Sequence, residues 1–517
     1  MKKDFDIIVI GAGSGGLNIA GFMNKAGFKV CLIDKSDKAI GGDCLNYGCI
    51  PSKALIHIAR GVAAGKSSEK FFVNGKTDNE QKSESRQIDI TKVMEAVKAK
   101  QEIIREHENA EYFRSQGMEV VLGLAKFISK NSVEVNGVPY KAKKIVLATG
   151  SRPVEIDIKG NNADDADNSE TDGNNKIPVY TNETIFNIKT LPKNLLVIGG
   201  GPIGIELGQA FSMLGSKVTI VHKGLRILEK EDSEIAEALA KKLNKQGIDI
   251  LLKSEVLEIR GIDGVANAVI ISGENSVDKE SLIPADAILL SIGRKLNIEN
   301  LDLEKAGIEI MTTKDAKSAL SKIKVNEYLQ TTNRKVFLCG DVVGQHQFTH
   351  AAELHAALIL RNFFAPVGFG LLGNLFKKKL NTDSLSWVTF TSPEIATFGI
   401  NEKTLIDRGE GFEILTDNFT HDDRAITDEY RDGIIKLFVG TSGRHKGKLL
   451  GGTLISPKAG EIVQELILTQ SSRLPIKYIF NKIYPYPTSS RINKRVITKY
   501  FARSLSGLAK KVLKVLY

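Results

Sequence analysis

Two segments of this chain, residues 5–34 and 195–222, repeat one pattern of apolar and polar positions. Each segment opens with a short apolar run, passes through a glycine-rich turn into a stretch whose apolar residues have helical spacing, and closes with a second apolar run. This order predicts a strand, a helix and a second strand. The chain is therefore expected to contain two βαβ units.

Two polar stretches interrupt the apolar pattern. Residues 161–175 are rich in Asn, Asp, Ser and Gly, and residues 66–87 are similarly polar. Segments of this composition cannot bury enough apolar surface to order themselves. We expect both to be exposed loops, the first near a domain boundary, and a helix to run from about residue 90 to 116 after the second.

The pattern changes after Asp341, where strands and helices no longer follow the βαβ order. Strands are predicted at 387–397, 434–439 and 449–455, and helices at 460–468 and 491–505. This part favours a separate domain. The expected fold is α/β, with two Rossmann-like dinucleotide-binding domains and a C-terminal α+β domain.

The turn of the first unit has G-x-G-x-x-G spacing, formed by Gly11, Gly13 and Gly16. Glycines so spaced let the backbone approach a pyrophosphate at the start of a helix, and an acid ending the next strand can bind ribose hydroxyls. Asp34 stands at that strand end. Spacing and context predict a dinucleotide site, and a plain glycine turn is the alternative.

The second unit repeats the spacing with Gly199, Gly201 and Gly204, but His222 stands where the acid is expected. Lys223 and Arg226 follow it. A basic strand end can hold a 2′-phosphate, so the pattern favours NADPH over NADH. The alternative is that these basic side chains point into water.

A third motif reads GGDCLNYGCIPSK from Gly41 to Lys53 and places two cysteines, Cys44 and Cys49, at the start of a predicted helix. Unpaired amides and the dipole at a helix N-terminus stabilise a thiolate, and a close pair of cysteines can store two electrons. We expect a redox-active pair. Cys31 and Cys339 lie in apolar runs and are expected in the core.

Composition limits the possible functions. The chain has 517 residues, 42% of them hydrophobic, which suits several domains. Its formal charge is +10, but the 61 acidic residues are interspersed, so nucleic-acid binding is not expected. Four cysteines make no disulfide scaffold, which fits a cytoplasmic setting. The apolar runs are too short for a signal peptide or a membrane-spanning helix.

The cysteine segment closely resembles the signature of the class I pyridine nucleotide-disulfide oxidoreductases, the family of dihydrolipoyl dehydrogenase, glutathione reductase and mercuric reductase. The resemblance covers most of the chain. It continues through residues 147–151, 291–294, 339–341 and 387–394.

The resemblance implies an FAD-dependent enzyme that uses NAD(P)H and forms a homodimer. By this likeness Cys49 is the charge-transfer thiol against the flavin, Cys44 is the interchange thiol that meets the acceptor, and Lys53 forms an ion pair with Glu206 beside the isoalloxazine. Asp341 would contact the ribityl chain. Further cofactor-binding positions implied are Gly42, Ala125, Thr149, Gly150, Ser151, Gly293, Arg294 and Thr349, and no resident metal site is expected.

One position departs from the disulfide reductases of this family. Their C-terminal motif carries a catalytic His and, five positions later, a Glu, where this chain has Tyr486 and Arg491. The near-neutral acid/base that protonates a leaving thiolate is therefore absent. With a Tyr at this site, the chain resembles mercuric reductase. However, it lacks the C-terminal cysteine pair and the N-terminal cysteine-containing domain that many mercuric reductases carry.

Several acceptors therefore remain open. The favoured function is mercuric reductase-like transfer from NAD(P)H through flavin and the Cys44–Cys49 disulfide to a small molecule or metal ion. The alternatives are a dihydrolipoyl dehydrogenase-type disulfide reductase, an NAD(P)H:quinone reductase, and a redox-sensing flavoprotein without turnover.

The resemblance also divides the chain. Residues 1–158 and 286–362 are expected to form the FAD-binding domain, 179–285 the NAD(P)-binding domain and 385–500 the dimerisation domain. The connecting segments are a polar insertion at 159–178, an apolar-basic loop at 363–384 and an amphipathic basic tail at 501–517.

Two of these segments could touch an anionic membrane. Residues 363–380 and 501–517 combine apolar side chains with lysines, and the second has helical spacing. The alternative is that both pack on the body of the protein or on a dimer partner.

Overall fold

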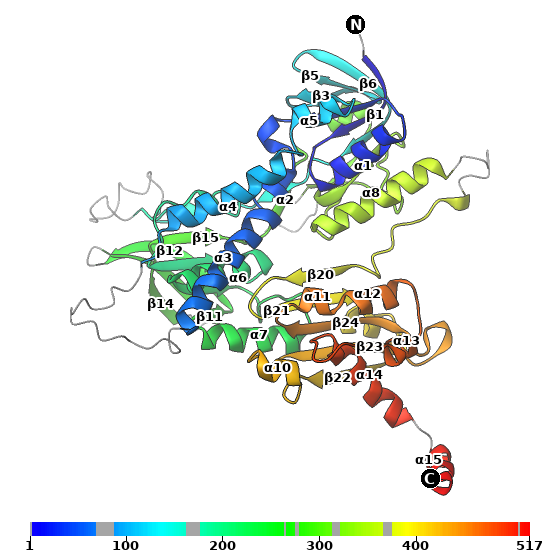
Figure 1. Cartoon of the computed structure of the whole chain (residues 1–517). Helices are drawn as coiled ribbons and strands as arrows, with labels where there is room; N and C mark the ends of the chain where they lie inside the picture. The colour runs from blue at the N-terminus through cyan, green and yellow to red at the C-terminus, as the bar shows by residue number, and fades with distance from the viewer. Residues whose placement is uncertain are drawn as a thin grey trace.

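The computed structural model describes residues 3–68, 87–161, 176–262, 265–273, 279–312, 321–365, 375–504 and 507–517. Most of the two predicted polar loops and residues 366–374 of the apolar-basic segment lie outside these residues. Figure 1 shows three bodies, with the first βαβ unit at the top, the second at the left and the C-terminal domain below. The predicted α/β class is confirmed.

The first sheet is built around β1 (Lys3–Ile10), which pairs in parallel with β2 (Val30–Asp34) and β6 (Val138–Leu147). Its apolar run is buried on both faces, because Ile7, Ile8 and Val9 are each 0% exposed. The sheet also contains β3 (Glu119–Leu122), β4 (Lys126–Ser129), β5 (Ser132–Val135) and β19 (Val336–Leu338). Since β19 pairs with β6, the chain returns to this sheet after building the second one.

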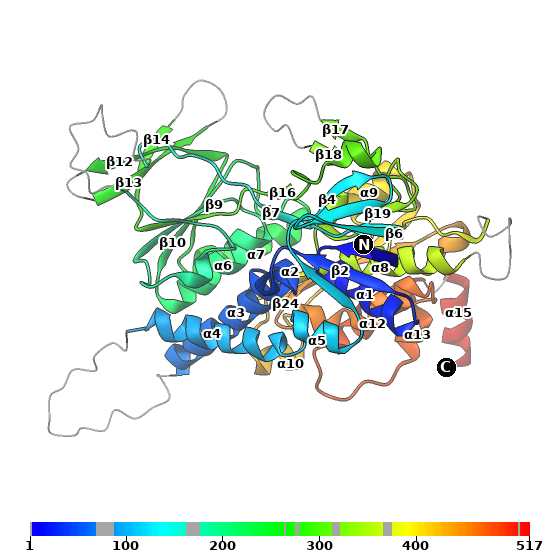
Figure 2. The same cartoon turned by 90° about the horizontal axis from the view of Figure 1, so that it is seen from above.

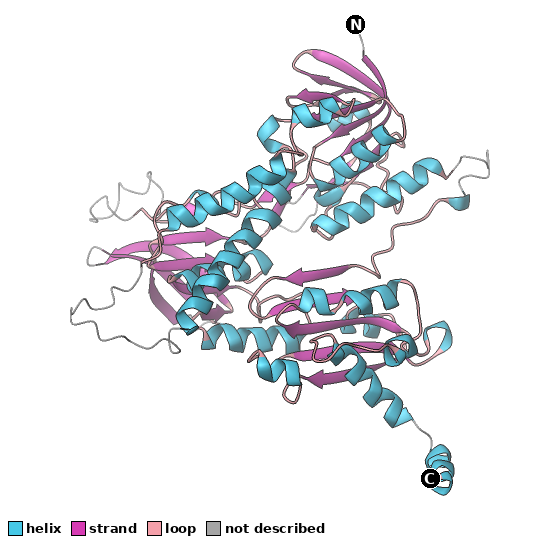
Figure 3. Cartoon of the chain, viewed as in Figure 1, coloured by secondary structure: helices cyan, strands magenta, loops and turns pink. Residues whose placement is uncertain are grey.

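Helices surround the first sheet and extend from it (Figures 1 and 3). They are α1 (Ser14–Lys25), α2 (Gly42–Asn46), α3 (Cys49–Ser68), α4 (Ile90–Arg105), α5 (Ala110–Ser115) and α8 (Thr349–Phe364). The prediction of one helix over 90–116 is wrong, because α4 ends at Arg105 and α5 starts anew. The side chain of Asn109 caps α5 by accepting the Tyr112 N–H at 2.8 Å.

The second sheet is parallel and has the order β11-β10-β9-β15-β8. Its strands are β8 (Val179–Tyr180), β9 (Asn194–Ile198), β10 (Lys217–His222), β11 (Asp249–Leu252) and β15 (Ala287–Leu290), with α6 (Pro202–Leu214) and α7 (Ser233–Lys245) beside them. Beyond it lies an antiparallel sheet of β12 (Ser254–Ile262), β13 (Val265–Ser272) and β14 (Lys279–Pro284) (Figure 2). The first two sheets are connected through β7 (Ser151–Pro153), which pairs with β16 (Arg294–Leu296).

The C-terminal domain is an antiparallel sheet with helices. Its strands, in spatial order, are β20 (Ser386–Thr389), β21 (Glu394–Gly399), β24 (Leu449–Ser456), β23 (Ile434–Gly440) and β22 (Phe412–Asn418). The main helices are α9 (Glu402–Asp407), α10 (Asp423–Thr427), α11 (Ala459–Ile462), α12 (Gln464–Ser471), α13 (Lys477–Asn481), α14 (Arg491–Ser504) and α15 (Gly507–Leu516).

Two predicted elements of this domain are divided in the structure. The predicted helix at 460–468 is split between α11 and α12, and the predicted strand at 387–397 is two antiparallel strands joined by a turn over residues 390–393. Pro393 cannot donate a hydrogen bond to a sheet, which explains why the apolar run does not continue as one strand. None of the helices in the described ranges is both long and apolar enough to span a bilayer.

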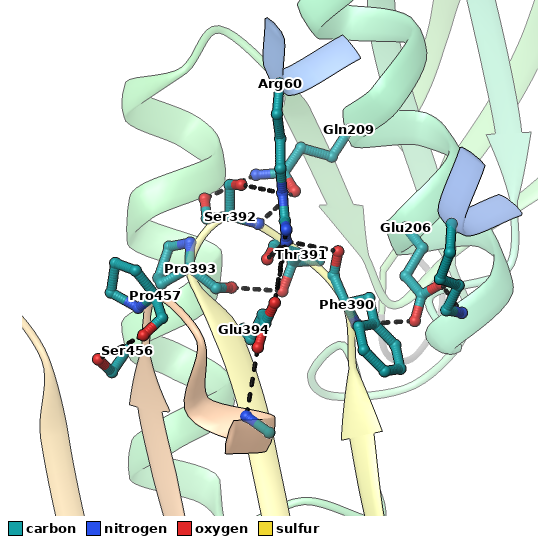
Figure 4. Close-up of polar contacts among 12 residues, drawn as sticks. Arg60, Glu206, Gln209, Phe390, Thr391, Ser392, Pro393, Glu394, Ser456 and Pro457 are labelled. Carbon is teal, nitrogen blue, oxygen red and sulfur yellow. Dashed lines mark hydrogen bonds and ion pairs between the residues drawn. The ribbon is translucent and has the colours of Figure 1, made fainter. Parts of the chain in front are cut away.

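The turn over residues 390–393 is where the three bodies meet (Figure 4). Arg60 of α3 donates to the carbonyl oxygens of Thr391 at 2.7 Å and Phe390 at 3.2 Å. It also pairs with Glu394 at 3.4 Å. From α6, the amide of Gln209 accepts the backbone N–H of residue 392 at 2.7 Å and donates to its carbonyl at 2.8 Å. The C-terminal domain is thus fixed to a helix of each nucleotide-binding unit.

Replacing Arg60 with Met should weaken this junction. Loss of the guanidinium leaves the backbone carbonyls of this turn without their donor and the carboxylate of Glu394 without its cation, so we expect the free energy of unfolding to fall by about 1–3 kcal/mol in denaturant titrations. The control is Arg424→Met, which removes an exposed pair with Asp428 and should cost less than about 1 kcal/mol. Equal losses in the two variants would contradict this role of Arg60.

Candidate active site

Cys44 and Cys49 lie together where α2 gives way to α3. Cys49 is the first residue of α3, and its sulfur is 3.3 Å from the hydroxyl oxygen of Thr349. A hydrogen bond from the Cys44 thiol, helped by Thr349 and the charge of Lys53, lowers the pKa of Cys49 to about 6. Because the Cys44 thiol donates this hydrogen bond and is also buried, the pKa of Cys44 is raised. At neutral pH the pair therefore holds one thiolate, on Cys49.

The other two cysteines are in the core, as predicted. Cys31 of β2 is 0% exposed and Cys339, which follows β19, is 1% exposed. Burial raises the pKa of the Cys339 thiol. Both thiols are buried, whereas Cys49 is partly accessible at the start of a long helix, the position that favours reactivity.

One turn beyond Cys49 along α3, Lys53 pairs with Glu206 of α6 at 2.8 Å. The carboxylate is buried, with 7% of its side chain exposed, and its second oxygen accepts the backbone N–H of Phe390 at 2.8 Å. The Lys53 ammonium also lies 4.5 Å from the centre of the Phe390 ring. The ion pair that the resemblance implies is thus present. It joins α3 and α6 to the turn over residues 390–393 of the C-terminal domain.

A polar cluster lies on the other side of the cysteine motif. The carboxylate of Asp341 accepts the Ser151 hydroxyl at 2.6 Å, and Arg294 donates to the same Ser151 oxygen at 2.7 Å. Arg294 also pairs with Asp43, the neighbour of Cys44, at 3.2 Å. Burial raises the pKa of Asp341. The structure therefore connects three predicted cofactor residues to the cysteine motif through Asp43, which the sequence did not single out.

The first glycine motif is shaped for close approach. Gly11 has φ +104°, and a Cβ atom there would lie 2.2 Å from the Ala148 carbonyl oxygen. Gly42 has φ +60°, and its Cβ would lie 2.6 Å from the Cα of Gly13, which caps α1. Gly16 lies in α1. Side chains are thus excluded where the start of α1 meets the cysteine motif.

Asp34 holds the end of β2 against this turn. Its carboxylate accepts the backbone N–H groups of Ala12 and Lys35, both at 2.6 Å, and burial raises its pKa. The bare helix start and this carboxylate are the groups that a dinucleotide requires. The residues present therefore fit FAD.

The second unit has the same geometry with a different side chain. His222 ends β10, and its Nδ1 accepts the backbone N–H of Gly200 at 3.1 Å, as Asp34 accepts that of Ala12. Gly199, Gly201 and Gly204 occupy the turn and the start of α6.

Acidic groups lie beside this strand end. Glu229 is 3.7 Å from Nε2 of His222, and Lys223 pairs with Glu255 at 2.8 Å. The strand end is therefore less basic than its sequence suggested, and the preference for NADPH stays a prediction.

The remaining predicted cofactor residues are distributed around these motifs. Thr149 and Gly150 bind Asn297: the Thr149 hydroxyl donates to its carbonyl oxygen at 2.7 Å, and Gly150 accepts its N–H at 3.0 Å. Gly293, with φ +132°, precedes β16. Ala125 is buried in the first core, between β3 and β4 along the chain.

Tyr486 belongs to the C-terminal domain and is 65% exposed. Its hydroxyl donates to Asp423 at 2.7 Å, and the guanidinium of Arg491 lies 4.8 Å from its ring centre. The hydrogen bond to Asp423 raises the pKa of Tyr486. Within one chain, these contacts hold Tyr486 to its own domain rather than to the cysteines.

Glu108 is an acidic residue beside Cys44 that the sequence analysis missed. Its Oε2 lies 2.8 Å from the position that a Cβ on Gly41 would take, and Gly41 is the residue that caps α2. Its negative charge contributes to the raised pKa of Cys44, and burial raises the pKa of Glu108 itself. Its place in the turn between α4 and α5 gave no signal in the sequence.

Comparison with known proteins identifies the family to which this chain belongs. The family described as pyridine nucleotide-disulphide oxidoreductase matches residues 5–356, and its dimerisation domain matches residues 385–496. The chain belongs to this family. It is an FAD-dependent oxidoreductase with NAD(P)H as the electron donor, and its dimerisation domain supports a homodimer.

Individual relatives differ in their acceptors. Mercuric reductase from Staphylococcus aureus is 28% identical over 487 residues, covering 94% of this chain and 80% of the relative. Dihydrolipoyl dehydrogenase from Mycoplasma genitalium is 29% identical, covering 96% and 100%. Among solved structures, the Cu(II) complex of the HOCl-induced flavoprotein disulfide reductase RclA from Escherichia coli is 25% identical with a TM-score of 0.75, covering 96% and 100%.

The reactivity of Cys49 should depend on pH with a midpoint near 6. Because its pKa is lowered to about 6, the thiolate is present above that pH and is lost as the pH falls below it. Iodoacetamide labelling of the reduced protein, mapped by mass spectrometry, measures this directly. Cys44→Ala removes the stabilising hydrogen bond and should move the midpoint upward. A midpoint near 9 in the parent protein would contradict the arrangement.

Glu229→Gln should shift coenzyme preference toward NADPH. The substitution removes a negative charge close to His222, where a 2′-phosphate would lie, so we expect the ratio of kcat/KM for NADPH to that for NADH to rise about fivefold, roughly 1 kcal/mol. Glu234→Gln, at an exposed position of α7, is the matched control. An unchanged ratio in Glu229→Gln would show that this carboxylate does not face the coenzyme.

Proposed function

We propose that this enzyme passes electrons from NADPH to a soft metal ion held by Cys44 and Cys49. The glycine turn at Gly11, with Asp34 and Asp341, would hold the FAD. FAD held there would supply the capacity to accept a hydride from the nicotinamide and to pass on two electrons. The chain's own residues then determine which acceptor those electrons reach.

The cysteine pair supplies the ligands for such an ion. Thiolate sulfur is a soft ligand that prefers soft metal ions. Cys49 carries the thiolate, and Cys44 gives up its proton when a cation takes its place on the sulfur. The hydroxyl of Thr349, 3.3 Å from Cys49, keeps a polar partner on this sulfur.

The observation that carries the proposal is Tyr486 in place of a histidine. When a disulfide is reduced, the leaving thiolate needs a proton from an acid of near-neutral pKa. A phenol with an ordinary pKa near 10 is a poor donor and a poor base at neutral pH, and Asp423 raises the pKa of Tyr486 further. Reduction of a metal ion needs no such proton, so it tolerates this replacement.

Three of the similar proteins are mercuric reductases, which supports a metal acceptor, whereas others are dihydrolipoyl dehydrogenases. The similar solved structure is a Cu(II) complex of a flavoprotein disulfide reductase, so it is compatible with either class. In the homodimer, a second copy of the chain would bring its own Tyr486 toward the cysteine pair.

The cytoplasm, where thiols stay reduced, is the proposed location.

Glu108 favours a second candidate, reduction of a small disulfide. A carboxyl group whose pKa is raised by burial can keep a proton closer to neutral pH than an exposed one. Placed beside Cys44, it could supply the proton that a leaving thiolate needs. The substrate would then be a dithiol/disulfide compound, as for dihydrolipoyl dehydrogenase.

Acceptor-dependent NADPH oxidation should distinguish these functions. We expect Hg²⁺, presented with excess thiol, to be turned over at least about tenfold faster than lipoamide, because the site lacks the histidine acid. Cys44→Ala and Cys49→Ala should each lower that rate by about a hundredfold or more. Cys31→Ala, which removes a thiol in the core, is the control.

Other outcomes assign other functions. Faster turnover of lipoamide or glutathione disulfide, lost in Glu108→Gln, would replace the metal by a disulfide. Quinone turnover that survives Cys44→Ala would indicate direct reduction by the flavin. No turnover with any acceptor would leave a redox sensor.

A further inference from the structure

The chain ends in two consecutive helices whose apolar sides have different surroundings. In α14, Ile492, Val496 and Ile497 are at most 1% exposed and belong to the core of the C-terminal domain. In α15, which projects away from that domain (Figure 1), the apolar residues from 512 to 516 are exposed. Val512 is 50% exposed, Leu513 39%, Val515 86% and Leu516 72%.

The side chains of α15 are separated by type around the helix. At about 100° per residue, Lys510, Lys511 and Lys514 fall within one narrow sector. The opposite side of the helix is apolar. Leu516 lies at its centre, flanked by Val512, Leu513 and Val515. The sequence from residue 488 to the end contains no Asp or Glu, so the polar side of α15 is purely basic.

We propose that α15 lies flat on the surface of an anionic lipid bilayer. Its apolar residues would enter the boundary between headgroups and acyl chains, and its lysines would remain among the lipid phosphates. A strongly amphipathic helix with lysines on one side and aliphatic residues on the other is suited to this position. The helix has 10 residues, which is too short to cross the bilayer.

The stability of α15 requires a surface to cover it. Isolated helices shorter than about 12–15 residues are marginal in water, and most helices in proteins are stabilised by burying an apolar face. Residues 510–517 of α15 are all exposed, so the body of the protein does not bury this part of the helix. A lipid surface would provide that burial along the whole apolar side.

Charge selects lipid over a second copy of the chain as the occupant. The polar side of α15 carries lysines and no acidic residue, so its charge is complementary to anionic headgroups, whereas a second copy of the chain has the same positive sign of net charge, +10. The matched dimerisation domain ends at residue 496, before α15 begins. Because a homodimer carries two such helices, weak binding of each would be strengthened by simultaneous engagement of both.

Vesicle sedimentation of the full-length protein tests this inference. Vesicles of phosphatidylcholine alone are compared with vesicles containing about a third phosphatidylglycerol, at low and high salt. The test variant is Lys510→Glu/Lys511→Glu/Lys514→Glu. Its matched control reverses three exposed lysines elsewhere, Lys98→Glu/Lys241→Glu/Lys403→Glu on α4, α7 and α9. Val512→Ser/Leu516→Ser tests the apolar side.

We expect the parent protein to bind only the anionic vesicles and to be released by salt. Each lysine near an anionic surface raises the partition coefficient about fivefold. Reversing the charge of the three lysines in α15 should therefore lower the partition coefficient at least about a hundredfold. The control should change it much less, and the serine variant should lower it without changing the net charge. Circular dichroism and light scattering show whether each variant keeps its fold and dimer.

Two results would overturn the inference. One is that the parent protein does not sediment with the anionic vesicles at low salt, or that the variant with three Lys→Glu substitutions in α15 sediments equally well. The other is loss of the dimer in the α15 variants, which would assign the helix to the partner chain. Neither result depends on the identity of the electron acceptor.

Discussion

A buried carboxylate needs a charged partner and hydrogen-bond donors, and at Glu206 that requirement determines how three parts of the chain meet. Lys53 supplies the charge from α3 and the backbone of Phe390 supplies a donor from the C-terminal domain. Because α3 also begins at Cys49 and carries Arg60 on a later turn, one helix sets the position of the thiolate, the ion pair and the domain junction. Displacement of this helix would disturb all three together.

The sequence was informative where a function depends on neighbouring residues. The glycine turns, Cys44 and Cys49 lie within short motifs, and Asp34 and His222 follow them at a fixed distance, so spacing alone predicted their placement. Lys53 and Glu206 are far apart in sequence and were paired only through the family resemblance. Folding brings together Asp43 and Arg294, Glu229 and His222, and Glu108 and the turn at Gly41. No local pattern in the sequence indicates these approaches.

The incorrect element boundaries share a physical cause. Side chains in turns can end an element that apolar spacing would extend: Asn109 caps α5 after a break, and Pro393 interrupts the run of residues 387–397. Both breaks are near the site. The first brings Glu108 to Cys44, and the second forms the turn that Arg60 and Gln209 bind. The places where periodicity failed are thus places where the chain supplies groups to the site.

The pairing of β19 with β6 has a consequence for synthesis on the ribosome. The first sheet receives this strand only when residues 336–338 have emerged, although its other strands are complete at residue 147. Domains generally fold as units from the N-terminus during translation. Here the second nucleotide-binding unit emerges while the first still lacks a strand, so the later unit completes its sheet before the earlier one does. A stop between residues 290 and 336 would leave the edge of β6 open at residues 145–147, because β5 covers only residues 138–141 of that edge. Unpaired strand edges of this kind are sites of aggregation.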